Sequence, residues 1–218
     1  KDVPYEERAY DQSHLPVREQ FTAEGHAVRG CYLYSAMADL ARIKSDEKLL
    51  SACKAIFKNI CEKRMYITGG IGSARVKESF TIDYDLPNQY AYSETCAAIS
   101  LALFANRMLK FEADSKYSDT VERVMYNGFL SSVSLDGKAF FYENPMEIIP
   151  YMYTRDCNGT SSSIHLPRPQ RSEVFGCSCC PPNIVRFIPS IANMLYTYDA
   201  DTVYVHQFMQ STTKIERN

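Results

Sequence analysis

Apolar residues recur at helical spacing along most of this chain, and this pattern restricts the fold more than any other feature of the sequence. The pattern is present in residues 23–44, 45–65, 93–111, 115–133 and 182–198. Apolar side chains spaced three and four residues apart lie on one face of a helix, and that face must be buried against another element. The sequence therefore predicts a mainly α-helical chain built from antiparallel helix pairs.

The remaining segments predict loops and a short β element. Residues 74–92 are polar and aromatic and are expected to form a long loop, of the kind that often carries function in a compact domain. Residues 134–176 are expected to be irregular or to form short strands, and residues 203–208 alternate as in a strand. Within the predicted helix 182–198, Pro189 should produce a kink.

A glycine-rich run, Gly69-Gly70-Ile71-Gly72-Ser73, follows the second predicted helix. It lacks the Gly-Lys-Ser/Thr ending of a phosphate-binding loop and does not follow a buried strand. The run therefore favours a tight turn with close approach of the backbone over nucleotide binding.

Charge and hydropathy exclude two classes of partner. The 218 residues include 24 basic and 26 acidic side chains, for a net charge of -2, which excludes nucleic-acid binding driven by gross positive charge. No apolar run approaches the roughly 18 residues of a membrane span, so no membrane contact is expected. Because the chain begins at Lys1 without a signal peptide, we expect a processed product or a piece of a longer protein.

Eight cysteines are an unusual number for a chain that is long enough to fold without disulfides. Three of them lie within helical apolar patterns and are expected to be inert core thiols: Cys31, Cys53 and Cys61. By contrast, three cysteines fall within residues 177–180. A metal site, a reactive thiol and a disulfide all remain open for this run, and composition favours metal binding or catalysis.

Two of these cysteines can be combined with residues at another predicted helix start. Glu94 and Cys96 lie near the start of helix 93–111, for which Ser93 is the expected N-cap, and Cys179 and Cys180 directly precede a helix. Helix N-termini favour anions and lower thiol pKa values. The four groups form a candidate zinc site. The alternative, a helix-start carboxylate at Glu94 and a core thiol at Cys96, stays open.

A second set of candidates lies in the loop and at an earlier helix start. Glu78, followed by Asp83 and Asp85, lies in the long loop. A carboxylic acid near an anionic nucleophile is the minimum requirement for a retaining glycosidase, although from these residues alone a solvated loop carboxylate is the favoured explanation of Glu78. His26 lies at a helix start, where a single histidine is more often structural than functional.

Six short segments, in this order, together resemble glycoside hydrolase family 127, the β-L-arabinofuranosidase family. They are residues 14–18 (HLPVR), 25–29 (GHAVR), 66–73 (YITGGIGS), 78–88 (ESFTIDYDLPN), 92–96 (YSETC) and 179–183 (CCPPN). Each segment alone is weak, but the ordered set spans nearly the whole chain and is specific to the family.

The resemblance implies an (α/α)6 barrel catalytic domain followed by β-sandwich domains. Residues 1–199 would then be part of the barrel and residues 200–218 the start of a β-sandwich. Such a barrel has twelve helices, and the sequence predicts about five. We therefore expect this segment alone to expose apolar helix flanks, to associate into homo-oligomers or be poorly soluble, and to have weak or no activity.

The resemblance also implies a retaining glycosidase that releases β-linked L-arabinofuranose from a β-L-arabinofuranoside. It implies that Cys179 is the nucleophile, that Glu78 is the general acid/base and that His26 lines the sugar pocket. The implied zinc ligands are Glu94, Cys96, Cys179 and Cys180. Cys157 and Cys177 receive no role.

Two other functions remain as alternatives. One is a non-catalytic, zinc-stabilised helical scaffold or carbohydrate-binding fragment, in which Cys179 is only a structural ligand and Glu78 has no role. The other is a thiol redox protein using Cys177 and Cys179, which requires a disulfide and no metal. The sequence leaves the compartment open between the cytoplasm and the periplasm of a bacterium.

Overall fold

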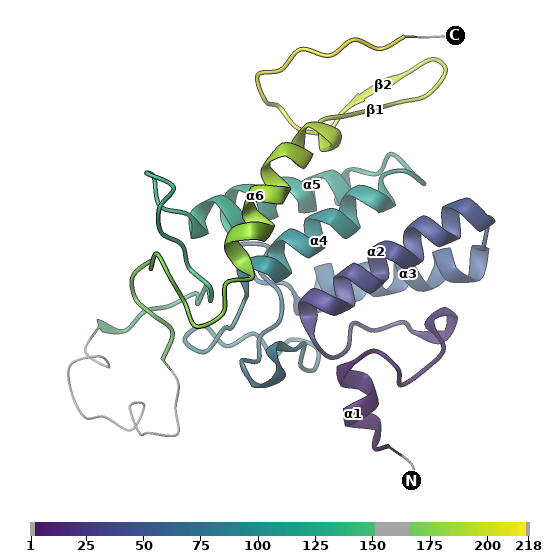
Figure 1. The fold of residues 1–218 in the computed structure, drawn as a ribbon. Coiled ribbons are helices and arrows are strands. Elements are labelled where there is room, and N and C mark those ends of the chain that lie inside the picture. The colour runs from purple at the N-terminus through teal and green to yellow at the C-terminus, as the bar shows by residue number, and fades with distance from the viewer. Residues whose placement is uncertain (1–2, 151–165, 217–218) are drawn as a thin grey trace.

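The computed structural model describes residues 3–150 and 166–216, and this part of the chain is mainly helical (Figure 1). The α-helices are α1 (Tyr5–Tyr10), α2 (Ala27–Lys44), α3 (Glu47–Asn59), α4 (Thr95–Met108), α5 (Ser115–Arg123) and α6 (Cys180–Ser190). The strands β1 (Tyr196–Tyr198) and β2 (Val203–Val205) form a small antiparallel sheet in which Thr197 pairs with Tyr204. None of the described helices combines the length and apolarity that crossing a bilayer needs.

Helix α4 lies at the centre of this arrangement. It packs against α2 on one side and against α5 and α6 on the other, and α2 forms a helical hairpin with α3 (Figure 1). Nearly every side chain of α4 is buried, as expected for a helix that is apolar on most of its circumference. Phe104 of α4 contacts the rings of Tyr34 and Phe57, with centroids 5.8 and 5.6 Å apart. The predicted amphipathic helices are thus present and packed in layers.

Two predicted helices are α-helical only in their first part and end in π-helical or 3-10 turns. The helix predicted over residues 45–65 begins after Asp46, which accepts a hydrogen bond from the Leu49 amide at 3.0 Å, and ends in a π-helical turn, Ile60–Arg64. The helix predicted over residues 115–133 likewise passes into the π-helical turn Val124–Phe129 and the 3-10 turn Leu130–Ser132.

The helix predicted over residues 182–198 is wrong at both ends. Helix α6 begins two residues earlier, at Cys180, and ends at Ser190, immediately after Pro189. A proline inside a helix removes one backbone hydrogen bond and clashes with the preceding turn. The chain continues as the 3-10 turn Ile191–Met194 and then enters β1, so Pro189 ends the helix rather than only kinking it.

The glycine run forms the tight turn that the sequence predicts. Gly69 and Gly72 have φ values of +87° and +79°, and the Tyr66 amide donates to the Gly70 carbonyl at 2.9 Å. A Cβ atom added to Gly70 would lie 1.9 Å from the hydroxyl oxygen of Ser93, next to the start of α4. The turn therefore lets the backbone at Gly70 lie against the side chain of Ser93, just before α4 begins.

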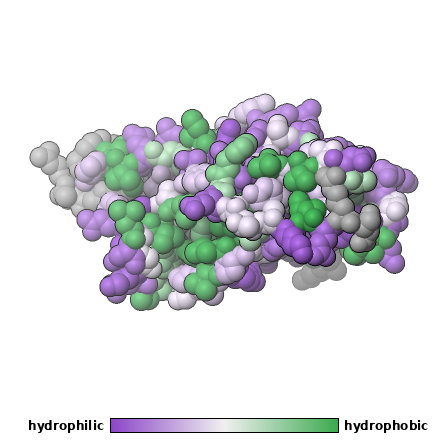
Figure 2. All heavy atoms as spheres, turned by 90° about the horizontal axis from the view of Figure 1, so that it is seen from above, coloured by the Kyte–Doolittle hydropathy of each residue, from purple (hydrophilic) through white to green (hydrophobic). Residues whose placement is uncertain are grey.

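Several large apolar side chains are exposed on the described part of the chain. Val185 and Ile188 on α6, Ile43 on α2 and Phe208 after β2 are each more than half exposed. Figure 2 shows hydrophobic patches interspersed with hydrophilic ones on the face seen from above. Such patches fit the predicted self-association of the isolated segment, which stays a prediction.

The contact between Gly70 and Ser93 predicts a specific coupling. Gly70→Ala should lower the free energy of unfolding by roughly 1–3 kcal/mol, because the new methyl group overlaps the Ser93 hydroxyl. Adding Ser93→Ala removes that oxygen and should restore part of the loss. Denaturant unfolding of the two single variants and the double variant measures the coupling. Strictly additive effects would show that the two residues do not clash.

Candidate active site and metal centre

The backbone before α4 delivers Glu94 to the site. Ser93 has a φ of +42°, and its amide donates to the Gly72 carbonyl at 2.9 Å, so Ser93 is not the N-cap. The N-cap position belongs to Glu94, whose side chain caps no amide. The expectation for Ser93 was wrong because its amide is hydrogen-bonded to the glycine turn and its backbone is in the left-handed region. The Glu94 carboxylate is consequently free of a capping role and lies toward the cysteines.

The packing of α6 on α4 brings the cysteines together. Cys96 is in the first turn of α4, Cys180 is the first residue of α6, and both are buried. The Cys96 sulfur lies 3.5 Å from that of Cys180 and 3.7 Å from that of Cys179. The Cys179 sulfur lies 3.3 Å from Glu94 Oε1. The ligand atoms of all four residues lie within 4.8 Å of one another, so the structure brings the predicted metal ligands together.

The electrostatics of this cluster fit a bound cation. Burial, followed by the neighbouring Cys179 charge, raises the pKa of Glu94 to about 8. Hydrogen bonds to Cys179 raise the pKa of both Cys96 and Cys180, and hydrogen bonds from these two thiols lower the pKa of Cys179. The buried groups therefore resist carrying several negative charges together. A divalent cation would offset that cost, and three sulfurs with one carboxylate are a donor set typical of zinc.

A tyrosine connects this cluster to the predicted acid/base. Tyr142 Oη lies 3.2 Å from the Cys179 sulfur and 3.4 Å from Glu78 Oε1. The Tyr142 backbone carbonyl accepts a hydrogen bond from the Thr95 amide at 3.0 Å, which fixes the residue against the start of α4. Burial raises the pKa of Tyr142, so its hydroxyl stays protonated. The sulfur and the carboxylate thus lie within two hydrogen-bond lengths of each other.

Glu78 is held in a strained turn of the long loop. Lys77 and Glu78 have φ values of +60° and +51°, a conformation that non-glycine residues rarely adopt. Backbone hydrogen bonds in both directions between Ala74 and Ser79 close this turn. Consecutive residues in such a conformation persist only where the surroundings enforce it, and they cluster at functional sites.

Three side chains surround the Glu78 carboxylate. Tyr92 donates its hydroxyl hydrogen to Oε1 at 2.5 Å, Tyr142 lies beside the same oxygen, and His26 Nε2 lies 2.9 Å from Oε2. His26 is the N-cap of α2, where Nδ1 accepts from the Arg29 amide at 3.4 Å. That bond assigns the ring hydrogen to Nε2, which then donates to Glu78. The predicted residues His26 and Glu78 are therefore in direct contact.

Asp83, which the sequence groups with Glu78, lies elsewhere and has a structural role. Its carboxylate accepts hydrogen bonds from Lys63, Arg64 and Asn59 at 2.8, 2.8 and 2.9 Å. The bond from Lys63, followed by that from Arg64, holds the pKa of Asp83 well below its usual range. This network fastens the long loop to the end of α3.

The other cysteines lie outside the cluster. Cys31 and Cys53 are fully buried, and burial raises the pKa of each to about 12, which confirms them as inert core thiols. Cys61 is half-buried near Thr120. Cys177 is exposed and, like Cys179, a free thiol in the part of the chain described, so the redox alternative gains no support. Cys157 lies outside the described residues.

Two tyrosines of this site were not predicted from the sequence. Tyr92 opens the segment YSETC, so its position beside Glu94 is a signal that could have drawn attention to it. Tyr142 belongs to a short aromatic run, residues 140–142, in which nothing distinguishes it from a core residue. Only the fold reveals that its hydroxyl lies between Cys179 and Glu78.

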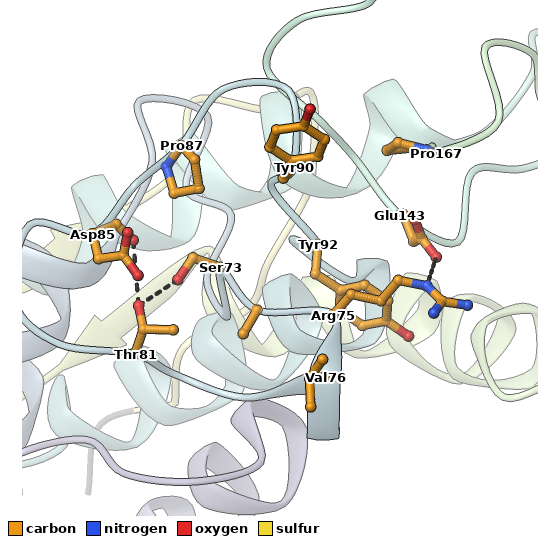
Figure 3. A pocket seen from close by; sticks show the side chains of 11 residues that line it. Ser73, Arg75, Val76, Thr81, Asp85, Pro87, Tyr90, Tyr92, Glu143 and Pro167 are labelled. Atoms are coloured by element: carbon orange, nitrogen blue, oxygen red, sulfur yellow. Dashed lines mark hydrogen bonds and ion pairs between the residues drawn. The ribbon is translucent and has the colours of Figure 1, made fainter. Parts of the chain in front are cut away.

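A cavity of about 520 Å³ adjoins this site (Figure 3). The Arg75–Glu143 ion pair, with 3.6 Å between Nε and Oε1, lies on one side of it. Ser73 and Thr81, whose hydroxyl oxygens lie 2.6 Å apart, are on the other side. Tyr92 also lines the cavity, and its hydroxyl binds Glu78.

Both the sequence and the structure of this chain resemble those of known proteins. Residues 2–193 match the family model of the β-L-arabinofuranosidase GH127 catalytic domain. The chain is 41% identical over 216 residues to the non-reducing end β-L-arabinofuranosidase of Bifidobacterium longum subsp. longum, covering 98% of this chain and 32% of that protein.

Solved structures agree with this match. A crystal structure of a GH127 β-L-arabinofuranosidase from Geobacillus stearothermophilus T6 is 48% identical with a TM-score of 0.83, covering 92% of this chain and 31% of that one. A second GH127 β-arabinofuranosidase is 45% identical with a TM-score of 0.79, covering 92% and 29%. The chain thus spans about a third of the length of these relatives. It belongs to glycoside hydrolase family 127, the β-L-arabinofuranosidase family.

Proposed function

We propose that this chain forms part of the active site of a retaining glycoside hydrolase that releases β-linked L-arabinofuranose. In this proposal the thiolate of Cys179 is the nucleophile, Glu78 is the general acid/base and His26 lines the sugar pocket. Glu94, Cys96, Cys179 and Cys180 hold a zinc ion. The proposed activity belongs to the whole enzyme. Its relatives are about three times as long as this chain.

The observation that carries the proposal is the shared contact of Tyr142 with Cys179 and Glu78. A retaining glycosidase needs its nucleophile and its acid/base roughly 5–5.5 Å apart, on either side of one glycosidic bond. Two groups within reach of one hydroxyl meet that requirement in scale. A purely structural metal site would need no carboxylate at the position of Glu78.

The chemistry divides into two displacements. In the first, the Cys179 sulfur attacks the anomeric carbon while Glu78 protonates the departing glycosidic oxygen. This forms a C–S bond and releases the leaving group as an alcohol. In the second, Glu78 removes a proton from water, the water oxygen displaces the sulfur, and the free sugar leaves. Two inversions at the same carbon give net retention of configuration.

The residues around Cys179 and Glu78 support these steps. The Tyr142 hydroxyl, 3.2 Å from the Cys179 sulfur, can stabilise the thiolate of Cys179, which is the reactive form of the residue. Tyr142 has a single hydroxyl hydrogen, which it can donate either to the thiolate or to Glu78. His26 and Tyr92 orient the Glu78 carboxylate through separate oxygens. When bound, zinc supplies positive charge that keeps its cysteine ligands ionised at neutral pH and stabilises the sulfur as it departs.

The family also carries expectations for the surrounding architecture. We propose that residues 1–199 belong to an (α/α)6 barrel and that residues 200–218 begin a β-sandwich domain. The antiparallel layers of α2, α3, α4 and α5 and the hairpin β1–β2 support this division. The partner is a carbohydrate with a terminal β-L-arabinofuranoside.

A zinc-stabilised scaffold without catalytic activity is the second candidate. The four-ligand cluster favours it as much as it favours catalysis, since closed structural zinc sites also have four protein ligands. The two candidates differ in what they require of Cys179 and Glu78 during turnover, and the following experiments separate them.

Replacing the nucleophile should abolish turnover. In the enzyme at its full natural length, Cys179→Ser should lower kcat for an aryl β-L-arabinofuranoside by about 10³-fold or more, because an alcohol ionises far less readily than a thiol. Cys177→Ser, two residues away and exposed, is the matched control and should retain activity and zinc. Metal analysis of each variant accompanies the kinetics. Full activity of Cys179→Ser would refute the nucleophile assignment.

Replacing the acid/base should affect substrates according to their leaving groups. Glu78→Gln should lower kcat/KM for an alkyl β-L-arabinofuranoside by roughly 10²–10⁴-fold, because an alkoxide needs protonation as it departs. The loss should be smaller for a nitrophenyl glycoside, whose phenolate leaves without help. Glu122→Gln, on the exposed face of α5, serves as control. An equal loss for both substrates would argue against an acid role.

Removing one hydroxyl should weaken the contact between the two catalytic groups. Tyr142→Phe should lower kcat by roughly ten- to a hundredfold, the cost of one hydrogen bond to a charged group. Zinc content and thermal stability should change little, since the ring packing on Tyr92 and Phe175 is retained. Tyr126→Phe, on the surface, is the control. An unaltered kcat for Tyr142→Phe would remove this residue from the mechanism.

A further inference from the structure

We infer that Tyr10, the last residue of α1, is a positioning residue for Glu78. Its ring holds the side chain of Lys77, which precedes Glu78 in the chain, and its backbone holds His26, which contacts the Glu78 carboxylate. The inference rests on the proposed function, because it gives α1 a part in orienting the acid of that reaction.

The contact between Tyr10 and Lys77 is the first observation. The Lys77 ammonium nitrogen lies 5.2 Å from the centroid of the Tyr10 ring, within the range of a cation–π interaction. Lys77 and Glu78 both have positive φ values, a conformation that persists only where the surroundings enforce it. An anchored Lys77 side chain therefore restrains the backbone turn that carries Glu78.

Arg29 places a second cation on the same ring. Its guanidinium carbon lies 4.5 Å from the centroid of the Tyr10 ring. Two cations close together repel each other, and the negative face of the aromatic ring offsets part of that repulsion. Arg29 is in the first turn of α2, so the Tyr10 ring connects the turn that carries Glu78 to the start of this helix.

The backbone of Tyr10 holds the segment before α2. Its carbonyl accepts a hydrogen bond from the His26 amide at 3.1 Å, and the Tyr10 and His26 rings lie 6.3 Å apart between centroids. Gln12 is buried, and its side-chain amide donates to the carbonyls of Tyr10 and Glu24 at 3.2 and 2.8 Å. A Cβ atom added to Gly25 would lie 2.4 Å from the Tyr10 carbonyl oxygen. The end of α1 is thus packed tightly against the residues that lead to His26.

Tyr10 therefore contacts both neighbours of the proposed acid. His26 Nε2 lies 2.9 Å from Glu78 Oε2, and a β-bridge pairs His26 with Ser79. A general acid must lie within hydrogen-bond reach of the oxygen that it protonates, so a small displacement lowers the rate. Loss of the Tyr10 ring should release Lys77 and displace the Glu78 carboxylate without removing any of the proposed catalytic groups.

The test uses the enzyme at its full natural length and two substrates that differ in their need for an acid. One is an alkyl β-L-arabinofuranoside and the other is a nitrophenyl β-L-arabinofuranoside. The measured quantity is the ratio of kcat/KM for the alkyl glycoside to kcat/KM for the nitrophenyl glycoside. A displaced acid lowers this ratio, because only the alkoxide needs protonation, whereas partial unfolding lowers both constants and leaves the ratio unchanged.

Three variants probe the contact between the ring and the cation. Tyr10→Leu removes the ring, keeps an apolar side chain and should lower the ratio about fivefold, the scale of one cation–π contact. Lys77→Met, at an exposed position, removes only the cation and should lower the ratio to a similar extent. The double variant should lose no more than either single variant, because both residues act through one contact. An unchanged ratio in either single variant, or strictly additive losses, would overturn the inference.

Two controls separate positioning from the stability of α1. Tyr10→Phe keeps the ring and should keep the ratio. Tyr5→Leu is the matched control, because Tyr5 lies on the same helix, is 48% exposed and contacts the ring of His14. It should leave the ratio unchanged. A loss in Tyr5→Leu as large as that in Tyr10→Leu would assign the effect to the helix as a whole and overturn the inference.

Glu78→Gln distinguishes failure of the inference from failure of the proposed function. If the wild-type enzyme hydrolyses neither glycoside, or if Glu78→Gln lowers both constants equally, the proposed function is wrong and the positioning role falls with it. If Glu78→Gln lowers the ratio and Tyr10→Leu does not, only the positioning role is wrong. Added to Glu78→Gln, Tyr10→Leu should lower the ratio no further, because Tyr10 acts through Glu78.

Discussion

The contact between the first turns of α4 and α6 is the interaction on which the site depends. It joins residues more than eighty positions apart in the sequence and places Cys96 against Cys180 at 3.5 Å in a buried position. Burial makes several negative charges on these residues costly to hold together. A cation removes that cost, so this contact stabilises the fold fully only when its charges are compensated. Folding and metal binding are for this reason expected to be coupled.

The two halves of the proposed catalytic machinery are held in different ways. Cys179 directly precedes α6, whose packing on α4 fixes it. Glu78 lies in a turn with two consecutive positive φ values, anchored to the rest of the molecule by His26 and by the hydrogen bonds of Asp83 at the end of α3. Such a conformation is enforced by its surroundings rather than preferred by the residues themselves. The hydrogen bonds of Asp83 to Asn59, Lys63 and Arg64 therefore help to hold the loop that carries Glu78.

The sequence predicted most of the helices and the cluster of candidate metal ligands, because both leave local signatures, but it did not predict the short helix α1. Helical spacing of apolar residues predicted α2, α3, α4 and α5, and three cysteines within four residues drew attention to Cys179 and Cys180. It failed where tertiary contacts override local preference. Ser93 is a favourable N-cap residue, yet the Gly72 carbonyl holds it in the left-handed region. In the sequence, nothing distinguishes Tyr142 from an aromatic core residue. Its position depends on a tertiary contact, the hydrogen bond from the Thr95 amide of α4 to its carbonyl.

The two kinds of contact that hold Cys179 and Glu78 suit the different demands of the proposed chemistry. A nucleophile must meet one carbon atom along one line, and a sulfur set at the start of a packed helix suits that task. An acid/base must serve two partners in turn, first a glycosidic oxygen and then a water molecule. Glu78 is a third exposed and is held by side-chain hydroxyl and imidazole groups rather than by helix packing. Helix packing thus holds the sulfur, and side-chain hydrogen bonds hold the carboxylate that would serve both steps.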